Sequence, residues 1–106
     1  MIFKWDEEKN QTNIKKHQID FNDAKDIFRG VRLTAIDSRR DYGETRKISI
    51  GTIGHHVCVV VYTERAEITR IISARKANHR ERKHFYECIE KAKAKEKTSG
   101  SLKRRP

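Results

Sequence analysis

The chain has 106 residues, of which 35% are hydrophobic and 38% are charged, so it has material for one small domain with a thin core. No segment approaches the ~20 consecutive apolar residues of a membrane-spanning helix, so we expect no membrane partner. The N-terminal sequence MIFKWDEEKN lacks the basic-then-apolar order of a signal peptide, and we therefore expect a cytoplasmic protein.

The N-terminal third of the chain predicts a short strand followed by two helices. We predict a strand at Ile2–Trp5 and then a helix over Glu7–His17 with Asp6 as its N-cap. Asp20 is placed to cap a second helix, which Gly30 should end. The apolar face of this second helix is predicted to consist of Ala24, Ile27 and Phe28.

The middle of the chain predicts a meander of antiparallel strands joined by short turns. In chain order, the predicted strands are Arg32–Asp37, Arg46–Ile53, Val57–Glu64 and Glu67–Ala74.

Three details of this meander are also predicted. Gly51 is expected to mark a bulge. The run Val57–Tyr62 is apolar at successive positions, so its strand should be central and buried on both faces. In the last strand, two-residue alternation would place Arg70 on one face together with Ile68, Ile72 and Ala74.

A final helix should follow the meander. Asn78, with Glu81 three residues later, has the form of a capping box. Residues at helical spacing should pack this helix on the sheet, namely Phe85, Cys88, Ile89 and Ala92. We therefore predict an α+β domain over residues 1–92 and a basic, flexible tail over residues 93–106.

Positive charge is concentrated in the C-terminal part of the chain. The net charge is +10, and residues 65–106 hold 14 Lys and Arg against 5 Asp and Glu, while residues 1–64 hold 11 against 10. This asymmetry indicates a polyanion or an acidic partner, although a solvated basic helix with a loose tail would have the same composition.

The cysteines and histidines do not have metal-ligand spacing. Cys58 and Cys88 are far apart in the sequence, and we expect both to be buried thiols. His79 and His84 are five residues apart, which misses the i, i+4 face of a helix. No metal site is predicted.

Motifs along most of the chain, from about Ile2 to Glu87, resemble those of the BrnT family, the toxins of type II toxin–antitoxin systems. The opening Phe3–Asn10 matches an aromatic-x-Trp-Asp-x-x-Lys start. The other matching segments are Asn13, Lys16-His17, Ile19–Phe21, Val61–Arg65, Arg70–Ala77, Glu81-Arg82 and Tyr86.

One position departs from the family pattern. Gln18 stands where the family usually has a glycine after the Lys-His pair. Glycine tolerates a left-handed helix C-cap, so the geometry of this helix end is in question.

The resemblance implies a RelE-like fold and a ribonuclease that inhibits translation without a metal or other cofactor. It also implies a BrnA-like antitoxin with a ribbon-helix-helix DNA-binding domain. We expect a complex of two toxins and two antitoxins, which would contact operator DNA only through the antitoxin. RNA, free or on the ribosome, would be the substrate.

Arginines are the first candidates for the chemistry that this resemblance implies. Attack by the 2′-OH on the adjacent phosphate needs a base, an acid and cations that stabilise the charge on phosphorus. The planar guanidinium suits the last role. Arg65, Arg70 and Arg75 are the candidates. Their five-residue spacing would put neighbours on opposite faces of one unbroken strand, but we expect Arg65 in the hairpin turn and Arg75 past the strand end, from where both could reach the same side. Alternatively, they are solvated charges at the edge of the sheet.

The other candidates are histidine, tyrosine and further basic residues. His17 suits acid or base work, since histidine titrates near pH 6.5, but it would also suit the negative end of the first helix. Tyr86 is a candidate for stacking on a base or for donating a proton, or it packs half-buried. The candidates for RNA binding are Lys16, Lys76, Arg80, Arg82 and Lys83.

Two other hypotheses remain. The chain would also fit a non-catalytic module that binds RNA or the ribosome through phosphate contacts, because the sequence has no unmistakable general base. Alternatively, the basic surface is the face on which an antitoxin docks, which is compatible with a nuclease whose inhibitor covers its site.

Overall fold

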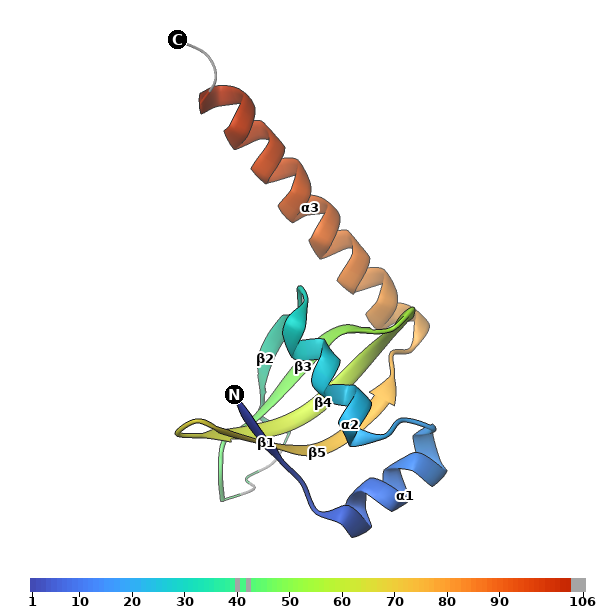
Figure 1. Cartoon of the computed structure of the whole chain (residues 1–106). Helices are drawn as coiled ribbons and strands as arrows, with labels where there is room; N and C mark the ends of the chain where they lie inside the picture. Colours follow the sequence, from blue (N-terminus) through green and yellow to red (C-terminus); the bar gives the residue numbers. More distant parts are fainter. Residues whose placement is uncertain (40, 42, 104–106) are drawn as a thin grey trace.

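The computed structural model describes residues 1–39, 41 and 43–103, with side chains to residue 95. In this part of the chain, five strands form one sheet in the order β1-β5-β4-β3-β2 (Figure 1). The expected α+β architecture, with two N-terminal helices, an antiparallel meander and a closing helix, is confirmed. The strands are β1 (Ile2–Lys4), β2 (Leu33–Asp37), β3 (Arg46–Ile53), β4 (His56–Arg65) and β5 (Ile68–Lys76). The helices are α1 (Glu7–His17), α2 (Phe21–Ala24), the 3-10 helix η1 (Lys25–Arg29) and α3 (His79–Lys103).

Helix α1 has the ends that its sequence predicts. The Asp6 carboxylate accepts hydrogen bonds from the backbone N–H groups of Glu8 and Lys9, at 2.9 and 3.3 Å. At the other end, Gln18 takes the left-handed C-cap conformation itself, with φ of 59° and ψ of 32°. Its N–H donates to the Ile14 carbonyl at 2.8 Å. The helix therefore ends as it would with glycine, and Gln18 carries the backbone strain.

The second predicted helix is shorter than expected as an α-helix. Asp20 caps it, accepting from the backbone N–H of Asn22 at 2.9 Å. After Ala24 the helix tightens into η1, which ends at Gly30 in extended backbone. Ala24 and Ile27 are buried and Phe28 is half-buried, so the predicted apolar face does pack on the sheet.

The prediction of a bulge at Gly51 is wrong. Gly51 pairs regularly with Cys58 inside the β3–β4 ladder. A Cβ atom at this position would lie 2.6 Å from Cγ1 of Ile27, closer than side-chain carbons approach one another. Gly51 therefore lets η1 lie close to the sheet.

The irregularity lies in β5, at Ile72. Tyr62 of β4 pairs with Ile71, and the next residue, Val61, pairs with Ser73, so Ile72 is an extra residue. The predicted shared face is therefore correct for Ile68 and Arg70 but wrong for Ala74, which lies on the opposite face. Ile71 and Ala74 are both buried, because the extra residue of the bulge places them on the same face of the sheet.

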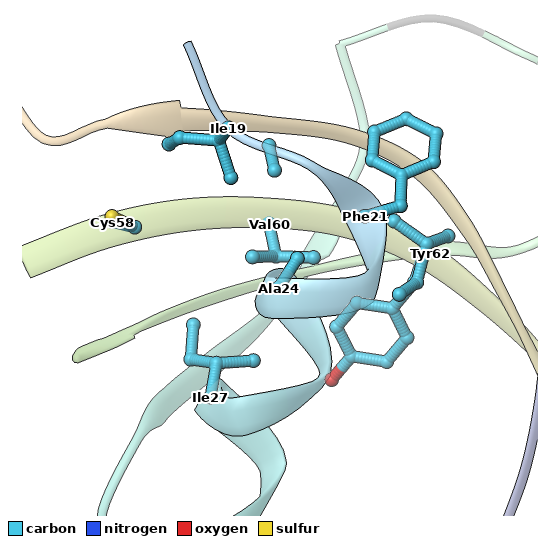
Figure 2. Packing of buried hydrophobic residues seen from close by; sticks show 9 residues of the cluster. Ile19, Phe21, Ala24, Ile27, Cys58, Val60 and Tyr62 are labelled. Atoms are coloured by element: carbon cyan, nitrogen blue, oxygen red, sulfur yellow. The ribbon is translucent and has the colours of Figure 1, made fainter. Parts of the chain in front are cut away.

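The core lies on both sides of β4. On one face, Phe21 and Ile27 pack against Tyr62 and other buried residues (Figure 2). On the other face, Val59 packs with Phe85 of α3. Strand β4 is thus buried on both faces, as predicted.

Helix α3 packs on the sheet only through its first turns. Phe85 is buried and Ile89 is half-buried, whereas Ala92, which was predicted to pack, is exposed. Figure 1 shows the reason, because α3 runs away from the sheet beyond this point. α3 remains helical to Lys103, so the predicted division between residues 92 and 93 stays a prediction. None of the helices among the described residues is long and apolar enough to cross a membrane.

Candidate nucleic-acid interface

Arg65, Arg70 and Arg75 project from the same face of the sheet. Arg65 pairs with Ile68 across a two-residue turn, Arg70 pairs with Thr63, and Arg75 pairs with Val59. Alternate residues of β4 share a face, so the neighbours of all three arginines lie on one side. Without the Ile72 bulge, the five-residue step from Arg70 to Arg75 would have reversed the face. We call this side of the sheet the arginine face.

Other polar residues share the arginine face by register. Lys4 of β1 pairs with Arg70 at one edge, and Asp37 of β2 pairs with Arg46 towards the other. Between Arg70 and Arg75 lies Ser73, which pairs with Val61. The face therefore combines cations, the hydroxyl group of Ser73 and the buried carboxylate of Asp37 over several strands.

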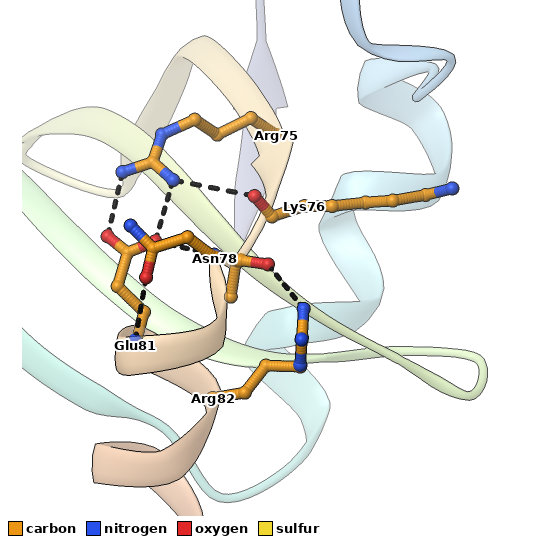
Figure 3. Close-up of polar contacts among 6 residues, drawn as sticks. Arg75, Lys76, Asn78, Glu81 and Arg82 are labelled. Carbon is orange, nitrogen blue, oxygen red and sulfur yellow. Dashed lines mark hydrogen bonds and ion pairs between the residues drawn. The ribbon is translucent and has the colours of Figure 1, made fainter.

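Arg75 is held in a fixed orientation by Glu81. The two guanidinium nitrogens Nη1 and Nη2 donate to Oε1 and Oε2 of Glu81, each at 2.8 Å (Figure 3). Glu81 and Asn78 also cap α3 reciprocally, since each side chain accepts from the other's backbone N–H, at 2.9 and 2.8 Å. The predicted capping box therefore also positions Arg75.

The ion pair between Arg75 and Glu81 shifts the pKa values of both side chains. The hydrogen bonds to Glu81 raise the pKa of Arg75, against the opposing effects of burial and of the like charge on Arg39. The hydrogen bonds from Arg75 hold the pKa of Glu81 below its ordinary value of 4.5. Arg75 is therefore a permanent cation, and Glu81 is ionised at neutral pH.

Arg70 and Arg65 line a second part of the face. Nη2 of Arg70 donates to Oε1 of Glu44 at 2.7 Å, and half of the Arg70 side chain remains exposed. Arg65 and Arg70 share an open hollow of about 650 Å³ with Glu44 and Thr63. This hollow is wide enough for a nucleotide, with guanidinium groups on its wall.

His17 and Lys16 lie at the margin of the arginine face. Both line a smaller hollow, of about 350 Å³, together with Ile72 and Ser73 of β5. Because Ser73 lies between Arg70 and Arg75 on the arginine face, the end of α1 adjoins the row of arginines.

Asn13 fixes α1 against β5 at this point. Its Nδ2 donates to the carbonyls of Ile19 and Ala74, at 2.8 and 2.9 Å, and its Oδ1 accepts from the Ala74 N–H at 3.1 Å. The side chain thus pairs with β5 as a neighbouring strand would, directly after the bulge. Asn13 was part of the sequence motif, but its role depends on a residue 61 positions away, which sequence reasoning did not reach.

The remaining basic candidates do not join this group. Lys76 pairs with Cys58, so it projects from the opposite face, and Figure 3 shows it pointing away from Arg75. Arg82 donates from Nη1 to the Ala77 carbonyl at 2.9 Å. Tyr86 is half exposed and packs edge-on against Phe85. The exposed residues Arg80 and Lys83 lie on the same first turns of α3.

The cysteines differ from the prediction in part. Cys58 is buried, and burial raises the pKa of its thiol. Cys88 is half-buried, with its Sγ 3.7 Å from Nε2 of His84 on the preceding turn of α3. Among the described residues, no three His, Cys, Asp or Glu side chains gather closely enough to hold a metal ion.

Comparison with known proteins gives one family. The model of the family described as "ribonuclease toxin, BrnT, of type II toxin–antitoxin system" matches residues 5–81, which confirms the resemblance seen in the motifs. The matched region contains Arg65, Arg70, Arg75, His17 and Glu81, and it ends before Tyr86. No curated protein matches the chain.

Proposed function

This chain belongs to the BrnT family of ribonuclease toxins of type II toxin–antitoxin systems, and we propose that its arginine face binds and cuts RNA. The observation that carries the proposal is the common orientation of Arg65, Arg70 and Arg75. Negative charge develops on the phosphoryl oxygens in the transition state, and guanidinium groups are cations that can stabilise it.

The proposed reaction is metal-independent transfer of the phosphoryl group from the 5′-oxygen to the 2′-oxygen of the RNA. The RNA 2′-OH loses its proton to a base as its oxygen attacks phosphorus, and the bond from phosphorus to the 5′-oxygen breaks. An acid protonates that oxygen, which leaves a 2′,3′-cyclic phosphate and a 5′-OH end. Arg70 and Arg75 stabilise the charge on the phosphoryl oxygens, and Arg65 holds the flanking phosphate.

We assign proton transfer to His17. An imidazole can accept or donate a proton through its ring nitrogens, and His17 lines the same hollow as Ser73 at the margin of the arginine face. Glu81 is less suited to this work, because Arg75 stabilises its ionised form and occupies both of its oxygens.

The basic first turns of α3 have a separate proposed role. Arg80, Arg82, Lys83 and Tyr86 would contact the RNA strand beyond the cleaved bond, by phosphate pairing and stacking. Lys76 has no place in this account, because it projects from the other side of the sheet.

The proposed partner is a BrnA-like ribbon-helix-helix antitoxin in a complex of two toxins and two antitoxins. The arginines are already paired with carboxylates inside the chain, as in Arg70 with Glu44 and Arg75 with Glu81. An acidic segment of the antitoxin would bind the same face and exclude RNA. In such a complex, operator DNA would be contacted by the antitoxin, and release of the toxin would inhibit translation.

Incubation of antitoxin-free protein with total RNA in EDTA tests the proposal. We expect cleavage that leaves 2′,3′-cyclic phosphate ends, and its loss in an Arg70→Ala, Arg75→Ala double variant. If neither protein cleaves, even with ribosomes supplied, while both bind RNA in a salt-dependent way, the non-catalytic binding module replaces the nuclease.

A further inference from the structure

The hollow between α1 and β5 has walls of defined chemistry. On α1, Lys9, Thr12 and Lys16 are three and four residues apart, so they share one face of the helix. On β5, the wall is formed by Ile72, the bulge residue, and Ser73. Its volume of about 350 Å³ is at the lower end of the range of ligand sites.

The lining suits a phosphate and a sugar. Lys9 and Lys16 supply ammonium groups, and Thr12 and Ser73 supply hydroxyl donors. Ile72 supplies an aliphatic side chain against which a ribose can pack, and His17 supplies an imidazole ring at the C-terminal end of α1. Glu8 lies on the same wall, about two turns before Lys16, and its charge favours an anion placed towards the C-terminal end of α1.

The walls are held rigidly relative to each other. Asn13, which also lines the hollow, is 6% exposed and bonds both backbone groups of Ala74. Ser73, the residue before Ala74, is therefore fixed relative to α1. A preorganised wall binds with a smaller loss of entropy than a mobile one.

We infer that this hollow binds the sugar–phosphate unit of the nucleotide next to the cleaved bond. Lys16 pairs with its backbone phosphate, Lys9 pairs with a neighbouring phosphate of the same strand, and Thr12 and Ser73 donate hydrogen bonds. Lys9 and Lys16 are separated by about 10 Å along the helix axis, so an RNA strand leaving the arginine face at Ser73 runs along α1. The inference rests on the proposed function for the identity of the ligand, and it adds Lys9, Thr12 and Ser73 to the interface.

The test measures the binding of a 2′-O-methyl RNA oligonucleotide, which lacks the attacking hydroxyl and so reports binding without cleavage. Affinities are measured from 50 to 300 mM salt for Lys9→Gln, Lys16→Gln and, as the matched control, Lys15→Gln. Lys15 is exposed on α1 and is not among the residues that line the hollow.

We expect Lys9→Gln and Lys16→Gln to reduce the slope of log affinity against log salt by about 0.7 for each lost phosphate contact. Lys15→Gln should keep the wild-type slope. Equal slopes for all three variants would overturn the inference, even if RNA cleavage still depends on Arg70 and Arg75. Conversely, reduced slopes in a protein that cuts no RNA would support the hollow as a phosphate site and would contradict the proposed nuclease activity.

Discussion

Gln18 occupies a position at which the backbone favours glycine. Its φ of 59° lies in the left-handed region, which costs a residue with a Cβ about 1 kcal/mol or more. We expect Gln18→Gly to stabilise the protein by about 0.5–1 kcal/mol in urea unfolding, because glycine reaches this conformation without the steric cost. Gln18→Ala keeps the strain and serves as the control. Neither variant keeps the bond from Gln18 Nε2 to the Lys15 carbonyl, so a glycine variant less stable than the alanine variant would contradict the strain.

Glu81 links the arginine face to protein stability through its charge. Arg75 lowers the pKa of Glu81, so the ionised form is stabilised by folding. A depressed carboxyl pKa gives stability that is present above the unfolded pKa and lost as pH falls through the folded one. Glu81→Gln should therefore cost about 1 kcal/mol at pH 7, and the difference from wild type should shrink below about pH 4.5. Thermal unfolding between pH 7 and pH 3 measures this. A difference that is constant with pH would contradict the ion pair.

Asn13 matters at the scale of whole elements, because it joins α1 to β5. Replacement by alanine would leave the carbonyls of Ile19 and Ala74 and the Ala74 N–H without this partner. We expect Asn13→Ala to destabilise the protein by about 2–4 kcal/mol, since buried polar groups lose their bonds. Gln11→Ala, an exposed change on the same helix, should stay within about 0.5 kcal/mol. Denaturant unfolding compares the two variants, and similar losses would show that Asn13 does not join the elements.

Local signals were sufficient to predict most elements. Asp6 as a cap and the apolar run of β4 depend on neighbours in the sequence, and the bounds of α1 and β3 were predicted correctly. The parallel pairing of β1 with β5 and the bulge at Ile72 were not predicted, because they arise from contacts between distant residues. The candidate site shows the same division. The three arginines were recognised as candidates from the sequence, but their position on one face depends on the bulge at Ile72. The bulge predicted at Gly51 was wrong, because the glycine is needed for the close packing of Ile27, which the local sequence does not show.

The shape of the whole molecule reflects the path of α3. The radius of gyration is 16.2 Å, compared with about 13 Å for a compact chain of this length. Beyond Ile89, the side chains from residues 90 to 95 are exposed. Truncation after Ala92 should therefore change the free energy of unfolding by less than about 0.5 kcal/mol. The same truncation should weaken RNA binding at low salt, because it removes basic residues. A large loss of stability would contradict the predicted domain boundary.

The proposed reaction depends on Arg70 and Arg75, on one face of the sheet, stabilising the charge on the phosphate that is cleaved. Single-turnover cleavage of a defined RNA in EDTA measures this dependence, with Arg70→Ala, Arg75→Ala and Lys76→Ala compared at saturating protein. Lys76 is the matched control, since it is adjacent to Arg75 but projects from the opposite face. We expect each arginine variant to cleave about 10²-fold more slowly than wild type, and Lys76→Ala to cleave at a rate near that of wild type. Equal losses in all three variants would contradict it, because they would show that general positive charge, rather than the arginine face, supports cleavage.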